Sequence, residues 1–146
     1  MATNNNGPIS ATTLAVQNKV YIDRVITDYG FVPKLPIINV TIGVSNIKPI
    51  FPEPGFIIDA LTVQDVFNRL IRSRYNNKTL VQEGQPYPPE ITRPVAYVPF
   101  SPSLEETSRY FFSILRPVFT KLGVRLDFVA VMSPIATARF TGQGIL

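Results

Sequence analysis

Fourteen prolines divide this chain of 146 residues into short segments and limit where helices and central strands can form. Proline fixes the backbone angle φ and has no backbone N–H, so it is disfavoured inside helices and inside central strands. Six prolines fall within residues 81–102, where they are interleaved with Tyr87, Tyr97 and Phe100. This density predicts a stiff, extended segment that can lie on its own domain or reach onto a neighbouring subunit.

Alternating apolar and polar residues predict strands on both sides of the proline-rich segment. Residues 37–44 alternate isoleucine or valine with polar or small residues, and residues 124–132 and 135–141 show the same period of two. Residues 13–29 are ambiguous, because their apolar positions also fit a helix that stops at Gly30. Their content of valine, isoleucine and threonine favours a strand.

Two segments have the apolar spacing of amphipathic helices. In residues 62–75, Thr62 is the expected N-cap, and apolar positions recur three and four residues apart. Residues 103–122 begin at Ser103, another expected N-cap, and end before Gly123. The order strand, strand, helix, proline-rich segment, helix, strand, strand predicts a single α+β domain. We expect a mostly antiparallel sheet with both helices on one face.

The predicted domain covers residues 13–146 and includes the extended segment 81–102. Residues 1–12 are polar and small and contain Gly7 followed by Pro8, so we expect an arm that is flexible or docked on a partner. No leader with a basic start and an apolar core is visible, and no apolar run approaches the roughly 20 residues of a membrane span. We therefore expect synthesis in the cytosol without a signal peptide, and no membrane span.

The chain lacks histidine and cysteine altogether. It therefore has no histidine general base, no thiol nucleophile, and no histidine or thiolate ligand for a metal. Its carboxylates show no spacing typical of paired catalytic acids, and Glu105 and Glu106 are expected to complement a helix dipole. No glycine-rich phosphate loop is present. We expect no catalytic, cofactor-binding or metal-binding residues, and no enzyme.

The net charge of +4 is concentrated on the two predicted helices. The best polar cluster consists of four cations in and just after the first helix: Arg69, Arg72, Arg74 and Lys78. Such a cluster can contact phosphate or an acidic protein surface. A solvated helix face explains the same pattern and is the favoured interpretation. The alternative function is a basic module that binds nucleic acid through the arginine-bearing helix faces.

Prolines and tyrosines in the proline-rich segment suit contacts with another protein. An already extended segment loses less conformational entropy on docking, and a Pro-Tyr-Pro-Pro sequence resembles ligands of aromatic grooves. Residues 110–112 are three consecutive aromatics that spread over about 200° of a helix, so they cannot all face one sheet. The expected partner-binding residues are Tyr87, Pro88, Pro89, Tyr97, Phe100 and Phe112.

Low charge also favours a protein that works through contacts with other chains. Only 16% of the residues are charged, against about 25% in an average domain, which indicates that part of the surface is not exposed to water. These features together predict a non-enzymatic structural subunit of a large assembly. We expect a virion component, such as a minor capsid, cement, or tail or connector protein. Its partners would be copies of itself or a larger shell or scaffold protein.

Overall fold

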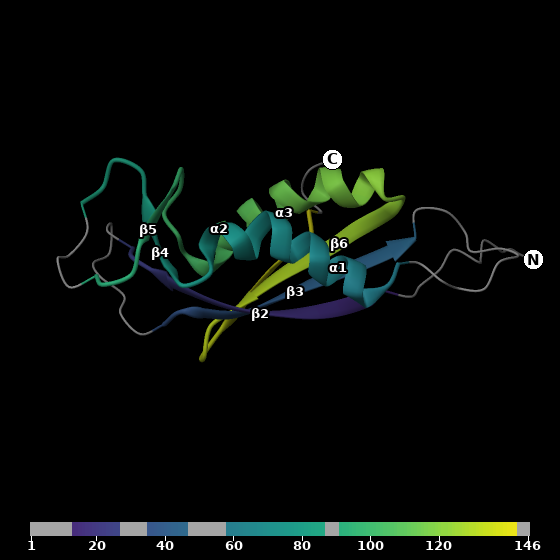
Figure 1. Ribbon diagram of the computed structural model, residues 1–146, viewed down its shortest axis with the longest axis horizontal. Helices are drawn as coiled ribbons and strands as arrows, with labels where there is room; N and C mark the ends of the chain where they lie inside the picture. The colour runs from purple at the N-terminus through teal and green to yellow at the C-terminus, as the bar shows by residue number, and fades with distance from the viewer. Residues whose placement is uncertain (1–12, 27–34, 47–57, 87–90, 143–146) are drawn as a thin grey trace, which may run out of the picture.

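The computed structural model describes residues 13–26, 35–46, 58–86 and 91–142. Its strands are β2 (Leu14–Arg24), β3 (Ile37–Asn46), β4 (Lys78–Gln82), β5 (Val95–Val98), β6 (Val124–Met132) and β7 (Thr137–Phe140). The first helical segment joins α1 (Ala60–Phe67), the π-helical turn η2 (Asn68–Arg72) and α2 (Ser73–Tyr75), and the second is α3 (Leu104–Lys121). Both helical segments lie on the same side of the sheet (Figure 1).

The six strands form one mixed sheet in the order β5-β4-β2-β3-β6-β7. Antiparallel pairing joins β2 to β3, β3 to β6 and β6 to β7, whereas β2 pairs with β4, and β4 with β5, in parallel. The predicted single α+β domain with two helices on one face is confirmed. The parallel half of the sheet was not expected, because β4 and β5 are short and β5 lies between Pro94 and Pro99.

The strand register separates two faces of the antiparallel half. One cross-strand row on the helix side consists of Val16, Ile42, Val129 and Phe140. The adjacent row on the opposite side consists of Gln17, Thr41, Ala130 and Arg139. Because side chains alternate between the faces of a strand, one face packs under the helices and the other is mixed in polarity. No helix within the described ranges covers that second face (Figure 1).

The core lies between the sheet and the apolar faces of the two helical segments. The helices contribute Val63, Phe67, Ile71, Phe111, Leu115 and Phe119, all of which are almost fully buried. Burying each of these large side chains contributes about 1.5–3 kcal/mol. The spacing of these residues is the one that predicted both helices, so the apolar pattern alone was sufficient to find them.

The structure corrects one of the two predicted helix N-caps and confirms the other. The first begins at Ala60, because Asp59 is its N-cap and accepts a hydrogen bond from the Leu61 N–H at 3.1 Å. The predicted cap Thr62 is therefore wrong, and the Asp59 carboxylate is the better acceptor beside the positive end of a helix. Ser103 is confirmed as the second N-cap, since its Oγ accepts from the Glu106 N–H at 3.1 Å.

Residues 81–102 are not one extended loop. Strand β4 continues to Gln82, and β5 forms the edge of the sheet between Pro94 and Pro99. An edge strand needs backbone partners on one side only, so proline at its ends is compatible with the pairing. The sequence argument overlooked both the end of the interior strand β4 and the edge strand β5. Residues 87–90 lie outside the described residues.

A buried arginine fastens β2 to the segments around it. The Arg24 guanidinium donates two hydrogen bonds to the Leu35 carbonyl, at 2.9 and 3.3 Å, and a third to the Pro102 carbonyl at 3.3 Å. Burial lowers the pKa of Arg24, and the Glu105 carboxylate partly opposes that shift. Arg24 therefore connects the start of α3 to the central strand through backbone carbonyls.

Candidate functional site

Exposed apolar side chains gather at one end of the sheet. Four of them form what we name the sheet-end cluster: Tyr21, Ile38, Met132 and Ile135. Their side chains are between 36% and 76% exposed. In the strand register, Asn39 of β3 pairs with Lys19 of β2 on one side and with Met132 of β6 on the other. The other members of the cluster, Tyr21, Ile38 and Ile135, lie one to three residues along the chain from these paired positions. The cluster therefore depends on pairing between segments that are far apart in the sequence.

Two local arrangements hold the ends of this cluster in place. The Arg93 guanidinium lies 4.5 Å from the centre of the Tyr21 ring and forms an ion pair with Asp23 at 2.9 Å. In the turn between β6 and β7, the Ser133 Oγ accepts hydrogen bonds from the N–H groups of Ile135 and Ala136. The exposed side chains are thus presented by ordered backbone rather than by loose loops.

The structure distributes the predicted partner-binding residues among different environments. Tyr97 is 53% exposed on the edge strand β5, where it is available to a partner. Phe100 is half-buried against Tyr110, with the ring centres 4.8 Å apart. Phe112 is buried against Phe140 at 5.0 Å, so it contributes to the chain's own core. Tyr87, Pro88 and Pro89 lie outside the described residues.

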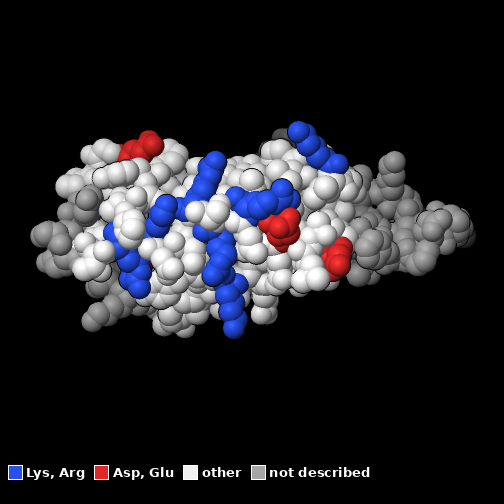
Figure 2. Space-filling model, in the orientation of Figure 1, with Lys and Arg blue, Asp and Glu red and all other residues white. Residues whose placement is uncertain are grey.

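The predicted basic cluster is partly engaged within the chain. Arg69 forms an ion pair with Asp65 at 2.9 Å, and Arg72 donates a hydrogen bond to the Lys19 carbonyl. Lys and Arg side chains nevertheless lie over the middle of one side of the molecule, with few acidic side chains between them (Figure 2). Arg74 is exposed on α2, whereas Lys78 is half-buried at the start of β4.

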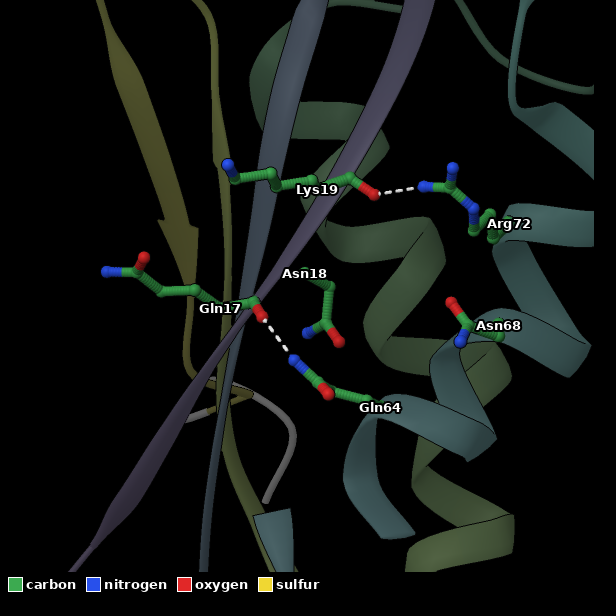
Figure 3. Close-up of a pocket in the computed structure, with 6 residues that line it drawn as sticks. All are labelled: Gln17, Asn18, Lys19, Gln64, Asn68 and Arg72. Carbon is green, nitrogen blue, oxygen red and sulfur yellow. Dashed lines mark hydrogen bonds between the residues drawn. The ribbon is translucent and has the colours of Figure 1, made fainter. Parts of the chain in front are cut away.

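A polar cleft of about 420 Å³ lies between β2 and the first helical segment. Its lining consists of Gln17, Asn18, Lys19, Gln64, Asn68 and Arg72 (Figure 3). The Gln64 side chain donates a hydrogen bond to the Gln17 carbonyl at 3.1 Å, beside the bond from Arg72 to Lys19. Of these six residues, only Arg72 was predicted from the sequence as a contact residue. The sequence does contain a pattern that could have predicted this cleft. It has three consecutive polar residues on a strand, and polar residues four apart on a helix.

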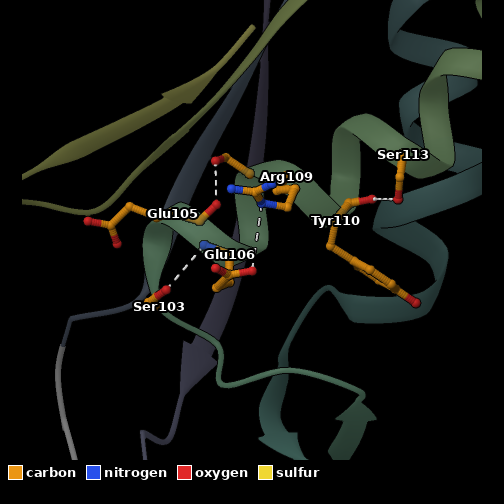
Figure 4. Close-up of polar contacts among 7 residues, drawn as sticks. Ser103, Glu105, Glu106, Arg109, Tyr110 and Ser113 are labelled. Carbon is orange, nitrogen blue, oxygen red and sulfur yellow. Dashed lines mark hydrogen bonds and ion pairs between the residues drawn. The ribbon is translucent and has the colours of Figure 1, made fainter. Parts of the chain in front are cut away.

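The polar residues at the start of α3 make their contacts within that helix. Glu105 and Glu106 lie in its first turn, and Glu106 is 3.8 Å from the Arg109 guanidinium (Figure 4). The Ser108 and Ser113 hydroxyls donate to backbone carbonyls one turn earlier, at 2.7 and 2.6 Å. This pattern of contacts stabilises a helix end and shows no pair of facing carboxylates.

Residues 13–26, 35–46, 58–86 and 91–142 contain neither a cluster of metal-binding side chains nor a helix that could span a membrane. Within those ranges, no three carboxylate side chains come together as a metal site, and no helix has the length and apolar character required to cross a membrane.

Comparison with known proteins supports the fold but indicates no function. No family model matches this sequence, and no curated protein matches it. Among solved structures, the chain is similar to an uncharacterized protein from Wolinella succinogenes, with a TM-score of 0.70 and 13% sequence identity. The match covers 89% of this chain and 97% of that chain. At this level of identity the likeness shows a shared fold alone.

Proposed function

We propose that this protein is a non-enzymatic structural subunit of a larger assembly and that it acts through contacts with other protein chains. The observation that carries the proposal is the sheet-end cluster of Tyr21, Ile38, Met132 and Ile135. Single exposed apolar residues are normal on a protein surface, whereas a group of them on neighbouring strands is typical of an interface.

Burial of this cluster would supply a useful part of an association energy. Covering a large apolar side chain contributes about 1.5–3 kcal/mol when burial is complete, and these four are partly exposed. The ordered turn at Ser133 and the Arg93 contact on Tyr21 reduce the entropy that docking must remove. Tyr97 is also exposed, on the edge strand β5, which lies two strands away from Tyr21.

The partner to test first is a second copy of the chain. Sedimentation velocity over a range of protein concentrations should give a mass above that of the monomer, and the mass should persist at high salt. Ile135→Asp should shift the protein towards monomer, because it places a charge in the contact surface. Leu61→Asp is the matched control: Leu61 is 69% exposed on α1, outside the cluster, so this variant should assemble normally.

The opposite result would overturn self-association through this surface. A monomer at every concentration would do so, as would equal effects of Ile135→Asp and Leu61→Asp. Nucleic acid added in the same experiment tests the alternative function: a mass gain at low salt that disappears at high salt would favour it, because phosphate contacts release counterions. The virion assignment remains a prediction from the sequence.

A further inference from the structure

One edge of β2 is open over much of its length. Strand β2 pairs with β3 from Leu14 to Ile22, but with β4 only from Ile22 to Arg24. Along residues 14–19, no strand within the described part of the chain pairs with the opposite edge. Open edges with unpaired backbone groups are templates for another strand. The polar cleft described above runs along this open edge.

A buried acceptor faces this cleft. Asn18 is only 4% exposed, and its Nδ2 donates hydrogen bonds to the Val16 carbonyl at 3.1 Å and the Val40 carbonyl at 3.0 Å. These two bonds fix which end of the amide carries the nitrogen. The Asn18 Oδ1 is buried and has no hydrogen-bond partner among the residues that the structure describes. A buried acceptor without a donor is unfavourable, so a ligand that brings an N–H group into the cleft would satisfy it.

The side chains of the cleft match the chemistry of a peptide backbone. Three side chains that point into the cleft carry amides, namely Asn18, Gln64 and Asn68, which can both donate and accept hydrogen bonds (Figure 3). Gln17 and Lys19 contribute their backbone carbonyls. Arg72 supplies a cation to the cleft, whereas the Lys19 side chain points away from it (Figure 3), and no carboxylate of the described residues lines the cleft. An extended peptide presents alternating N–H and C=O groups, and an acidic side chain on it would complement Arg72.

We propose that this cleft binds an extended, acidic segment of a partner protein as an additional strand on β2. The proposal rests on the function proposed above, because it names one contact that such a subunit would make. The N–H groups of the incoming strand replace Gln64 and Arg72 at the carbonyls of Gln17 and Lys19. Arg72 then binds the acidic side chain, and a backbone N–H reaches the Asn18 Oδ1.

The position of the helix limits what can occupy this edge. Gln64 and Arg72 reach the β2 carbonyls directly, so the first helical segment lies beside the open edge. Paired strands are about 4.8 Å apart, whereas packed helices need about 8–10 Å. Pairing of β2 with β2 of a second copy would press the two helical layers together. A single extended segment that carries no helix beside it avoids this clash.

The π-helical turn η2 helps to direct the helix side chains towards the edge. In a regular α-helix, residues eight apart are rotated by about 80° relative to each other. The wider turn over Asn68–Arg72 reduces that rotation between Gln64 and Arg72. Side chains two turns apart thereby reach alternate carbonyls of the same strand edge.

The probe for this proposal is a synthetic peptide that alternates threonine and glutamate, titrated into the full-length protein by calorimetry and by amide NMR. The amide signals of Gln17 and Lys19 should shift. Two control peptides have the same length: one is N-methylated at alternate amides, and one carries lysine in place of glutamate. Each should bind about tenfold more weakly, which is the effect of losing roughly one hydrogen bond.

Two variants test the residues of the cleft. Asn18→Leu removes the buried acceptor, and Arg72→Gln removes an exposed cation; each should weaken binding of the glutamate peptide about tenfold. Asn39→Leu, which changes an amide on β3 away from the cleft, should bind as the wild type does. Arg72→Gln changes an exposed side chain, so it remains informative even if Asn18→Leu unfolds the protein.

The outcomes separate this inference from the proposed function. Equal binding of all three peptides, or binding of none, would overturn the strand site. If the protein still assembles and Ile135→Asp disrupts that assembly, the proposed function stands without the strand site. If the peptide binds with the expected preferences and the protein remains monomeric, the strand site stands and self-association through the sheet-end cluster fails.

Discussion

The Phe128 ring lies directly over the backbone of Gly43 on the neighbouring strand. A Cβ at residue 43 would be 2.7 Å from Cζ of Phe128, and closer still to two other ring carbons. The Arg139 guanidinium also lies over this ring, 3.8 Å from its centre. An aromatic side chain packed over a glycine in this way shields the sheet where the glycine has no side chain of its own.

We therefore expect Gly43→Ala to destabilise the protein by about 1–3 kcal/mol, because the methyl group displaces the Phe128 ring. Urea unfolding followed by circular dichroism measures the change. In a Phe128→Ala background the same substitution should cost much less, since the obstacle has been removed. Equal costs in the two backgrounds would mean that the ring position is not the cause.

Loss of the Arg24 guanidinium should be among the most damaging single changes. Arg24→Met leaves the Leu35 and Pro102 carbonyls without their donor, and we expect a loss of about 2–4 kcal/mol in the free energy of unfolding. Arg24→Lys should restore little, because an ammonium cannot reproduce the planar fork of donors. Arg74→Met, at an exposed position on α2, is the matched control and should change stability very little.

The stability of the fold should decrease at high pH because of Tyr75. Burial raises the pKa of Tyr75 to about 12, and the hydrogen bond with Tyr110 adds to the shift. An unfolded tyrosine ionises near pH 10, so between about pH 10 and 12 the unfolded chain releases a proton that the folded chain retains. The stabilisation is complete below about pH 10 and disappears as the pH rises through 12. The loss is about 1–3 kcal/mol.

Unfolding by urea at about pH 9 and pH 12 tests this dependence. Tyr75→Phe should remove most of the decrease, because phenylalanine does not titrate. Tyr97→Phe changes an exposed tyrosine and should leave the decrease intact. A decrease of the same size in both variants would assign the pH dependence to another group.

Periodicity predicted the elements that bury one clear apolar face. Strand β3, strand β6 and both helical segments were found in this way, because each contributes a regular apolar row to one core. It failed for β4 and β5, which are short and parallel, and β5 also lies between two prolines. It also gave the wrong N-cap, since Asp59 and Thr62 both have side chains able to cap a helix.

The candidate sites could not be derived from the sequence, because both depend on register. The sheet-end cluster combines Tyr21 with Met132, and only the pairing of three strands brings them to the same end. The cleft depends on Asn18, which lies between two other polar residues. In a strand, its phase with Val16 and Val20 places Asn18 on the inner face, but residues 13–29 also fit a helix, so the sequence left the direction of this side chain open. The structure supplied that orientation.

The position of β2 and β3 in the sheet has a consequence for synthesis. These early strands lie at the centre, yet the far edge of β3 pairs only with β6, at residues 124–132. Contacts between distant segments form slowly, because a long loop must close first. While the ribosome is still making residues 47–123, this edge of β3 has no strand to pair with. The nascent chain is therefore most prone to aggregation late in translation, and a chaperone acting in that interval should raise the yield.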